Sequence, residues 1–360
     1  MRIAQIAPLY ERVPPLAYGA TERIVHYLTE ALVASGHDVT LFASGDSVTS
    51  ARLVACCESA LWRDERVEDT LGHHVHLLER VAQRAAEFDV LHFHCEPLHL
   101  PLARRLDTHC VTTMHGLLRE PDVGALLRAF SDAPLVSISA SQRRAMPFAN
   151  WRATIHHGLP ADAFGLCMSP GDYLLWMGRM MRGKRPDLAI EIARRAGLPL
   201  KMAAAVHPGE RAYFADEIAP LIESSAGFVE YLGEVGGDAR TELLRHARAL
   251  LFPIDWDEPF GMVMIEAFAC GTPVVAFRRG AVPEVVEDGV SGFVVDDLDG
   301  AVRAVERIDE LDRRRCRAAF DARFTAERMA RDYLRVYRAL ARGAERDTDL
   351  QSSRPQPAAR

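Results

Sequence analysis

Short apolar runs alternate with helical segments along almost the whole chain, and this alternation limits the fold more than any other feature. Each run is rich in aliphatic and β-branched residues, and the stretches between them carry apolar residues at helical spacing. Strands that alternate with helices form βαβ units, in which helices cover both faces of a parallel sheet. The strands expected in the first half are Ile3–Ala7, Val39–Phe42, Val90–His94, Cys110–Thr113, Leu135–Ile138 and Thr154–His156. Those expected in the second half are Tyr173–Met177, Leu200–Ala204, Phe228–Tyr231, Ala249–Phe252, Val274–Phe277 and Gly292–Val295.

Each half of the chain therefore holds enough strands for a sheet of its own. The 360 residues leave room for about two domains. The stretch GLPADAFGLCMSPG, residues 158–171, separates the two sets of strands and is typical of a linker. We expect an α/β protein of two doubly wound domains, residues 1–160 and 170–324, whose sheets face a common cleft.

Two segments follow the last expected strand. Residues 325–341 have an amphipathic helical pattern, and we expect this helix to pack back on the N-terminal domain. Residues 343–360 are polar and end in RPQPAAR, so we expect a disordered tail.

The composition is that of an ordinary globular protein. Apolar residues make up 49% of the chain and charged residues 26%, and the net charge of −7 gives no sign of the basic face that nucleic acids require. No run reaches the roughly 18–20 apolar residues of a membrane span, and the opening MRIAQIAPLYERVPP lacks the apolar region of a signal peptide. Seven cysteines without a CxxC pair favour free thiols, so we expect a cytoplasmic protein.

Two acidic residues, Glu258 and Glu266, bracket an apolar run in DEPFGMVMIEAFACGTPVVAF, residues 257–277. We expect this run to be a buried helix whose first N–H groups point into the cleft and favour a phosphate. Gly261 would let a ligand approach the backbone. Glu258 could accept hydrogen bonds from ligand hydroxyls, although an acid before a helix also stabilises the helix by about 0.3–1 kcal/mol. Glu266 needs a partner such as a ribose diol, because an unpaired charge is costly to bury.

This segment resembles the Glu-x7-Glu signature of the retaining glycosyltransferases of family four, with the frame E-P-F-G…E-A…A-C-G-T-P-V intact. The chain resembles that family over about residues 1–340. The resemblance implies the glycosyltransferase B fold, in which two Rossmann-like domains hold a nucleotide-sugar donor (C-terminal domain) and an acceptor (N-terminal domain). It implies that Glu258 contacts the donor sugar and that Glu266 binds the ribose. It also implies that the backbone at Phe260, Gly261 and Met262 holds the sugar and phosphates.

Four basic residues fall within seven positions of the segment WMGRMMRGKRPDLAIEIA, namely Arg179, Arg182, Lys184 and Arg185. Gly178, Arg179 and Lys184 lie between an expected strand and helix, where fixed positive charge could stabilise a departing pyrophosphate. From charge alone, a solvated loop is an equally good interpretation. The segment matches the family's G-R-x4-K pattern, which implies that Arg179 and Lys184 bind the diphosphate.

Two further positions lie at the ends of expected strands. Gly19 lies between the first strand and the first helix, where a phosphate or the acceptor is expected to approach closely, although a lone glycine is a weak signal. His115 ends the segment VTTMH, and a histidine there is a structural hydrogen-bonding group as often as a ligand contact. The family's T-x-H-G pattern implies that His115 contacts the donor sugar near the reacting centre.

A cluster at His92, His94, Cys95 and His99 is the best candidate for a metal site. Because the expected strand there is buried and only its end faces the cleft, we expect no metal ion.

The predicted function is transfer of a sugar, with retention, from a nucleoside diphosphate sugar to an acceptor hydroxyl. No metal or other cofactor is expected, and family habit favours a UDP-sugar. The acceptor, a small molecule or a glycan, would be recognised by residues 9–18, 44–70 and those after His94, and peripheral membrane contact stays open. The alternatives are a nucleotide-sugar 2-epimerase or hydrolase and a non-catalytic nucleotide-sugar-binding protein. A dinucleotide-dependent oxidoreductase is disfavoured, since neither half opens with G-x-G-x-x-G.

Overall fold

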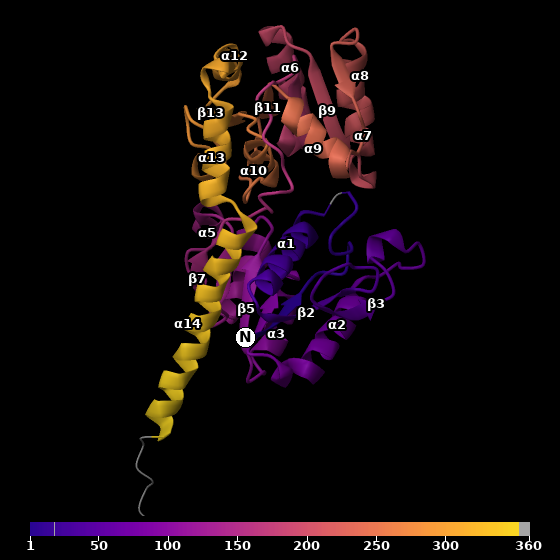
Figure 1. Cartoon of the computed structure of the whole chain (residues 1–360). Helices are drawn as coiled ribbons and strands as arrows, with labels where there is room; N and C mark the ends of the chain where they lie inside the picture. Colours follow the sequence, from indigo (N-terminus) through magenta and orange to yellow (C-terminus); the bar gives the residue numbers. More distant parts are fainter. Residues whose placement is uncertain (18, 353–360) are drawn as a thin grey trace, which may run out of the picture.

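The computed structural model describes residues 1–17 and 19–352, without the side chains of residues 96, 120 and 343–352. Two α/β lobes lie one above the other, and the C-terminal helix runs down beside the lower one (Figure 1). We call them the N-terminal lobe, built on the sheet of residues 2–154, and the C-terminal lobe, built on the sheet of residues 174–295. Two such lobes confirm the predicted fold class.

The N-terminal lobe contains a seven-stranded parallel sheet in the order β3-β2-β1-β4-β5-β6-β7. The strands are β1 (Arg2–Ile6), β2 (Asp38–Ser44), β3 (Arg52–Cys57), β4 (Val90–Phe93), β5 (His109–Met114), β6 (Leu135–Ser137) and β7 (Trp151–Thr154). The strand order reverses beside β1, and open α/β sheets bind ligands at the carboxyl ends of their strands at such a switch point.

Two of these strands correct the sequence prediction. β3 lies within residues 44–70, where no strand is expected from the sequence; it is an edge strand with Arg52 and Ala55 exposed, so its apolar signal is weak. The last strand is β7 at Trp151–Thr154, and not Thr154–His156. Ile155 N–H still donates to Ser137 O at 2.8 Å, but the residues after it leave the sheet, and Leu159 pairs with Thr325.

The helices of the N-terminal lobe connect its strands and cover its faces (Figure 1). They are α1 (Ala20–Ala34), α2 (Leu71–Arg84), α3 (Leu100–Ala103), α4 (Ala125–Ala129) and α5 (Ala140–Ala145), with short turns η1 (Leu61–Arg63), η2 (Ala85–Glu87), η3 (Glu96–His99) and η4 (Glu120–Gly124).

The C-terminal lobe contains a six-stranded parallel sheet in the order β10-β9-β8-β11-β12-β13. The strands are β8 (Leu174–Arg179), β9 (Leu200–Ala205), β10 (Val229–Tyr231), β11 (Ala249–Phe252), β12 (Val274–Phe277) and β13 (Gly292–Val295). The helices are α6 (Pro186–Ala196), α7 (Arg211–Tyr213), α8 (Ala219–Glu223), α9 (Gly237–His246), α10 (Met262–Ala269), α11 (Val282–Val285), α12 (Leu298–Glu306) and α13 (Arg313–Arg323), with η5 (Arg182–Lys184), η6 (Pro208–Glu210), η7 (Phe214–Ile218) and η8 (Ile308–Glu310).

Helix α10 occupies the core of the C-terminal lobe, as its composition MVMIEAFA requires. Every residue of the helix after Met262 is buried, and the helix lies against α9, α13 and β12. A helix that is apolar on all sides avoids water only in such a position. Packing on these elements holds the helix in place, and its N-terminal end lies at the cavity between the lobes.

The last helix, α14 (Ala326–Ser352), packs against α1 and β5 of the N-terminal lobe. Tyr333 and Tyr337 on this helix are fully buried. The helix extends through residues 343–352, which the sequence pattern assigns to a disordered tail; their Ala, Glu, Arg and Leu residues favour a helix that has already begun. Residues 353–360 lie outside the described part of the chain.

The described helices include none that is long and apolar enough to cross a membrane. None of the seven cysteines forms a disulfide.

Candidate active site

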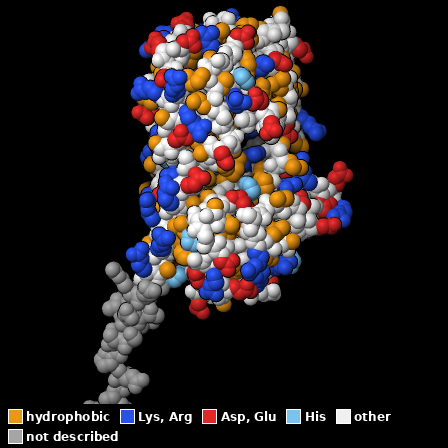
Figure 2. Space-filling model, viewed as in Figure 1, with side chains coloured by type: hydrophobic (Ala, Val, Ile, Leu, Met, Phe, Trp, Pro, Cys, Tyr) orange, Lys and Arg blue, Asp and Glu red, His pale blue; other side chains and the backbone are white. Residues whose placement is uncertain are grey.

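A cavity of about 350 Å³ lies between the two lobes, at the carboxyl ends of both sheets. Figure 2 shows this face of the molecule hollowed between the lobes, with basic, acidic and histidine side chains around the opening. The structure brings all ten predicted site residues to the wall of the cavity: Gly19, His115, Gly178, Arg179, Lys184, Glu258, Phe260, Gly261, Met262 and Glu266.

Lys184 and Glu258 meet directly in this cavity. The Lys184 ammonium forms an ion pair with Glu258 Oε2, and both side chains are largely buried, with 15% and 12% of their surfaces exposed. The same ammonium lies 5.1 Å from the ring of Trp256 and 5.2 Å from that of Phe252, distances at which cation–π attraction holds it in place. A charged pair is thus fixed at the cavity wall.

The loop that carries Glu258 is held by backbone contacts. Ala281 N–H donates to the Glu258 carbonyl at 3.0 Å, and Gly280 lies directly against the Glu258 backbone. A side chain at Gly280 would collide with Glu258 N and O. The position of Glu258 therefore depends on a glycine that lies beyond the next strand.

The N-terminal end of α10 opens into the cavity. Gly261 is its N-cap residue with φ of 87°, and a Cβ there would lie 2.6 Å from Met264 Cε. The first N–H groups of a helix have no intrahelical acceptor, and the helix dipole favours an anion at this end. Phe260 anchors the turn, since its ring is buried and packs edge-on against His157 at 4.9 Å.

Glu266 has the partner that its burial requires, and that partner is Arg240 of α9. Glu266 is 2% exposed and Arg240 25% exposed, and both line the cavity. No sequence motif indicates Arg240, because nothing in its local pattern shows that α9 faces α10 at this point.

The four basic residues of the η5 region divide into two groups. Arg179 lines the cavity and forms an ion pair with Glu210, while its Nε has no partner among the described residues. Arg182 instead pairs with Glu217 on the surface. Arg185 pairs with Asp187 and with Asp255, which follows β11. Only Arg179 and Lys184 of these four line the cavity.

The two remaining predicted glycines leave space beside the cavity. A Cβ on Gly178 would meet nothing within 4 Å, so a side chain there would take up cavity space. Gly19 has a φ of 141°, and a Cβ added to it would lie only 2.7 Å from Pro15 Cβ. The conformation of the loop before α1 therefore requires glycine at this position.

His115 projects from the end of β5 and is hydrogen-bonded to another histidine. Its Nε2 lies 2.8 Å from His94 Nδ1, and its ring stacks on that of His157 at 5.4 Å. Burial lowers the pKa of His115 to about 3 and lowers that of His94 and His157 well below the usual range. All three rings are therefore neutral near pH 7.

The candidate metal ligands have other partners. His92 is hydrogen-bonded to Tyr337 and Thr113, and His94 to Gln5 and His115. No cluster of three or more metal-ligating side chains occurs within residues 1–17 and 19–352.

Four residues that line the cavity each have a buried polar atom without a hydrogen-bond partner within the described part of the chain. The atoms are His115 Nδ1, His157 Nδ1, Arg179 Nε and Trp256 Nε1. Buried polar groups are rarely left unpaired, so a polar ligand is the natural partner for this set. Besides Arg240, the cavity also contains Arg23, Glu234 and Trp256, which no sequence motif identified.

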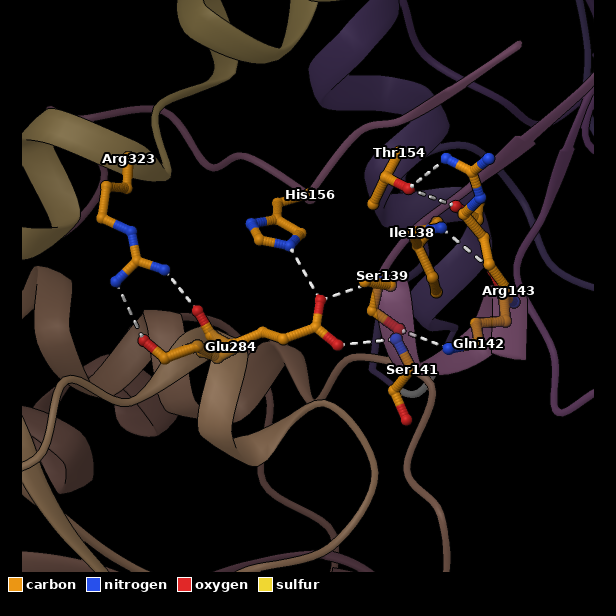
Figure 3. Close-up of polar contacts among 12 residues, drawn as sticks. Ile138, Ser139, Ser141, Gln142, Arg143, Thr154, His156, Glu284 and Arg323 are labelled. Carbon is orange, nitrogen blue, oxygen red and sulfur yellow. Dashed lines mark hydrogen bonds and ion pairs between the residues drawn. The ribbon is translucent and has the colours of Figure 1, made fainter. Parts of the chain in front are cut away.

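A second contact joins the lobes beside the cavity (Figure 3). Glu284 of α11 accepts hydrogen bonds from Ala140 N–H at 2.7 Å and Ser141 N–H at 2.6 Å, at the start of α5. His156 Nε2 lies 3.5 Å from the same carboxylate, and Arg323 donates to the Glu284 carbonyl. The carboxylate of one lobe thus faces the positive end of a helix in the other.

Both halves of the chain match known families of glycosyltransferases. Residues 21–159 match the model of glycosyltransferase family 4, and residues 171–311 match that of glycosyl transferases group 1. The chain carries the two domains of a glycosyltransferase of the B fold. The sequence prediction of this fold is confirmed.

The chain is 33% identical over 151 residues to a D-inositol 3-phosphate glycosyltransferase of Thermobifida fusca (strain YX). That match covers 39% of this chain and 33% of the relative, so the chain spans only about a third of this curated relative's length.

Solved structures share the fold over nearly the full length. AviGT4, a glycosyltransferase involved in avilamycin A biosynthesis, has a TM-score of 0.73 at 24% identity and covers 95% of this chain and 98% of its own. Anabaena HepE, solved in complex with UDP and glucose, has a TM-score of 0.71 at 17% identity, covering 93% and 99%.

Proposed function

We propose that this protein transfers a sugar, with retention at the anomeric carbon, from a UDP-sugar to an acceptor hydroxyl. One observation carries the proposal: Lys184, Glu258, Arg179, Glu266 and the start of α10 converge on one cavity between the lobes. HepE, which has the same fold, binds UDP and glucose. The curated relatives named glycosyltransferases support the same class of reaction.

The donor would lie along the wall formed by the C-terminal lobe. Glu266 accepts hydrogen bonds from the ribose hydroxyls, replacing or sharing its contact with Arg240. The N–H groups at Gly261 and Met262 bind the diphosphate, and Glu258 binds the sugar hydroxyls. Gly19 and Gly178 leave room for the donor to approach the backbone, and the N-terminal lobe, residues 1–160, holds the acceptor.

In the chemical step, the protein stabilises the charge that develops on the leaving phosphate and supplies no nucleophile of its own. The bond between the anomeric carbon and the phosphate oxygen breaks, and its electron pair goes to the leaving phosphate. The acceptor oxygen forms the new bond on the same face, and its proton passes to that phosphate. Arg179, Lys184 and the α10 dipole neutralise the developing charge, so we propose a reaction that needs no metal ion.

A panel of nucleotide sugars tests the donor. UDP-glucose, GDP-glucose, ADP-glucose and UDP alone are added at about 100 times their dissociation constants, where binding stabilises the folded protein by about 2.7 kcal/mol. We expect the UDP compounds to raise the melting temperature. If no nucleotide or nucleotide sugar raises it, the proposed donor site is wrong.

The reaction class needs a separate assay. A transferase releases UDP only when an acceptor is added, whereas a hydrolase releases it without one and a 2-epimerase returns an isomerised sugar. We therefore expect UDP release to depend on the acceptor. Cytoplasmic location is part of the same proposal, and seven cysteines without a disulfide support it.

A further inference from the structure

A chain of buried hydrogen bonds connects His115 to the C-terminal helix α14. Gln5 of β1 donates its Nε2–H to the Tyr337 hydroxyl at 3.2 Å, and Gln5 Oε1 lies 2.8 Å from His94 Nε2. His94 Nδ1 in turn lies 2.8 Å from His115 Nε2. Gln5, His94 and Tyr337 are at most 2% exposed, so no water competes for these bonds.

The orientation of the Gln5 amide decides every proton position in this chain. With Oε1 directed at His94, His94 Nε2 carries the hydrogen, because an amide oxygen only accepts. Neutral His94 then has a bare Nδ1, which accepts from His115 Nε2–H. Neutral His115 is left with a bare Nδ1.

The donors and acceptors of the other branch follow from the same orientation of the Gln5 amide. The Tyr337 hydroxyl, having accepted from Gln5, donates to His92 Nδ1 at 2.7 Å. His92 Nε2–H donates to Thr113 Oγ1 at 2.7 Å, and Thr113 is 2.8 Å from the Tyr333 hydroxyl. Each donor has an acceptor, so no buried bond in the network is lost.

The bare nitrogen of His115 is the ring nitrogen that has no partner. His115 Nδ1 is buried and has no hydrogen-bond partner among the described residues, while the residue lines the cavity. Such a nitrogen can accept a hydrogen bond and cannot donate one, so it pairs with a hydroxyl and not with a carbonyl or phosphate oxygen.

We propose that His94, held by Gln5 and Tyr337, is a positioning residue that keeps His115 Nδ1 as a hydrogen-bond acceptor for a hydroxyl of the donor sugar. This inference deepens the proposed function and rests on it for the identity of the hydroxyl. Gln5 of β1 and Tyr337 of α14, neither of which lines the cavity, would thereby determine the tautomer of His115 in its wall.

The protonation pattern can be measured without any ligand. The ¹⁵N spectrum of histidine-labelled protein at pH 7.5, assigned by its difference from the His115→Asn variant, should show His115 with a protonated Nε2 and a bare Nδ1. A His115 ring protonated on Nδ1 overturns the proposal. The result does not depend on which reaction the site catalyses.

Binding by two His94 variants tests the role. His94→Leu removes the acceptor for His115 Nε2–H, and we expect the dissociation constant of UDP-glucose to rise about tenfold or more, since a buried donor then lacks a partner. Asparagine can present Oδ1 in place of Nδ1, so in His94→Asn we expect a change below about threefold.

UDP, which lacks the sugar, is the control for folding, and its affinity should change less than about twofold in both variants. Equal losses of UDP-glucose affinity in both variants, or none in either, overturn the positioning role. Failure of the wild-type protein to bind UDP would contradict the proposed function, and the ¹⁵N spectrum would still decide the proton positions.

Discussion

At the scale of single residues, the charges in the cavity are paired before any ligand arrives. Lys184 contacts Glu258, Arg240 contacts Glu266 and Arg179 contacts Glu210. An unpaired charge at these largely buried positions would be costly, so the pairs let a polar cavity exist inside an apolar protein. The hydroxyls and phosphates of a donor must therefore replace the ion-pair contacts that these side chains already make with one another.

The basic side chains of the η5 region give a matched test of the proposed reaction. Lys184→Ala or Arg179→Ala removes a charge placed at the cavity, and we expect kcat to fall by about 10²–10³, the usual effect of losing one preorganised stabilising group. Arg182→Ala, whose parent side chain pairs with Glu217 on the surface, is the control and should keep near-normal kcat. Near-normal turnover in both cavity variants would refute the assigned roles.

Gly280 gives a second test at this scale. Gly280→Ala places a Cβ against Glu258 N and O at a φ of 51°, so the loop must shift to accept it. We expect a loss of stability of about 1–3 kcal/mol. We also expect the variant to lose more affinity for UDP-glucose than for UDP, relative to the wild type. Gly289→Ala is the control, because φ there is also positive (72°) and a Cβ meets nothing within 4 Å. If Gly280→Ala keeps the wild-type preference for UDP-glucose over UDP, the loop that carries Glu258 does not contribute to binding of the sugar.

At the scale of elements, α11 of one lobe and α5 of the other are joined through Glu284. Its hydrogen bonds to the start of α5 and its contact with His156 keep the pKa of Glu284 below its usual value, although burial acts in the opposite direction. The carboxylate is therefore ionised near pH 7 and faces the positive end of the α5 dipole. This contact favours the arrangement of lobes that encloses the cavity.

Replacing the charge tests that contact. Glu284→Gln keeps the shape and loses the charge, so we expect stability to fall by about 1–2 kcal/mol and the radius of gyration in solution scattering to rise as the lobes separate. Asp312→Asn is the control, because Asp312 caps α13 within the C-terminal lobe and Asn is an equally good cap. An unchanged radius of gyration in Glu284→Gln would show that other contacts hold the lobes.

At the scale of the whole molecule, buried titratable groups set the dependence of stability on pH. Burial lowers the pKa of His92, His94, His115 and His157, so the folded state stays unprotonated where the unfolded state, with ordinary pKa near 6.5, takes up protons. Each histidine then costs about 1.4 kcal/mol of stability per pH unit below about 6.5. Burial raises the pKa of Glu22 to about 7, which acts in the opposite direction between about pH 7 and 4.5.

Four histidines outweigh one glutamate, so we expect the midpoint of urea unfolding to fall between pH 7.5 and pH 5.5. Glu22→Gln removes the opposing group and should make the fall steeper. An equal or higher midpoint at pH 5.5 would mean that these histidines are protonated in the folded protein.

The sequence by itself determined the two sheets, their parallel character and the position of the cavity. Motifs such as E-P-F-G and G-R-x4-K lie in single strand–turn–helix units, and the fold places the carboxyl ends of such units together. These motifs, read with the family resemblance, were therefore sufficient to find Lys184 and Glu258. Local pattern was insufficient for the edge strand β3, where exposure on one face weakens the apolar signal.

Only the tertiary structure decided which distant groups meet. Arg240 reaches Glu266, Glu284 reaches the start of α5, and Tyr337 of the last helix joins Gln5 of the first strand. These partners are separated by up to 332 residues, and their side chains carry no local periodicity that would reveal the pairing. A buried polar group requires a hydrogen-bond partner, and the packing of the lobes and of α14 determines which group that partner is.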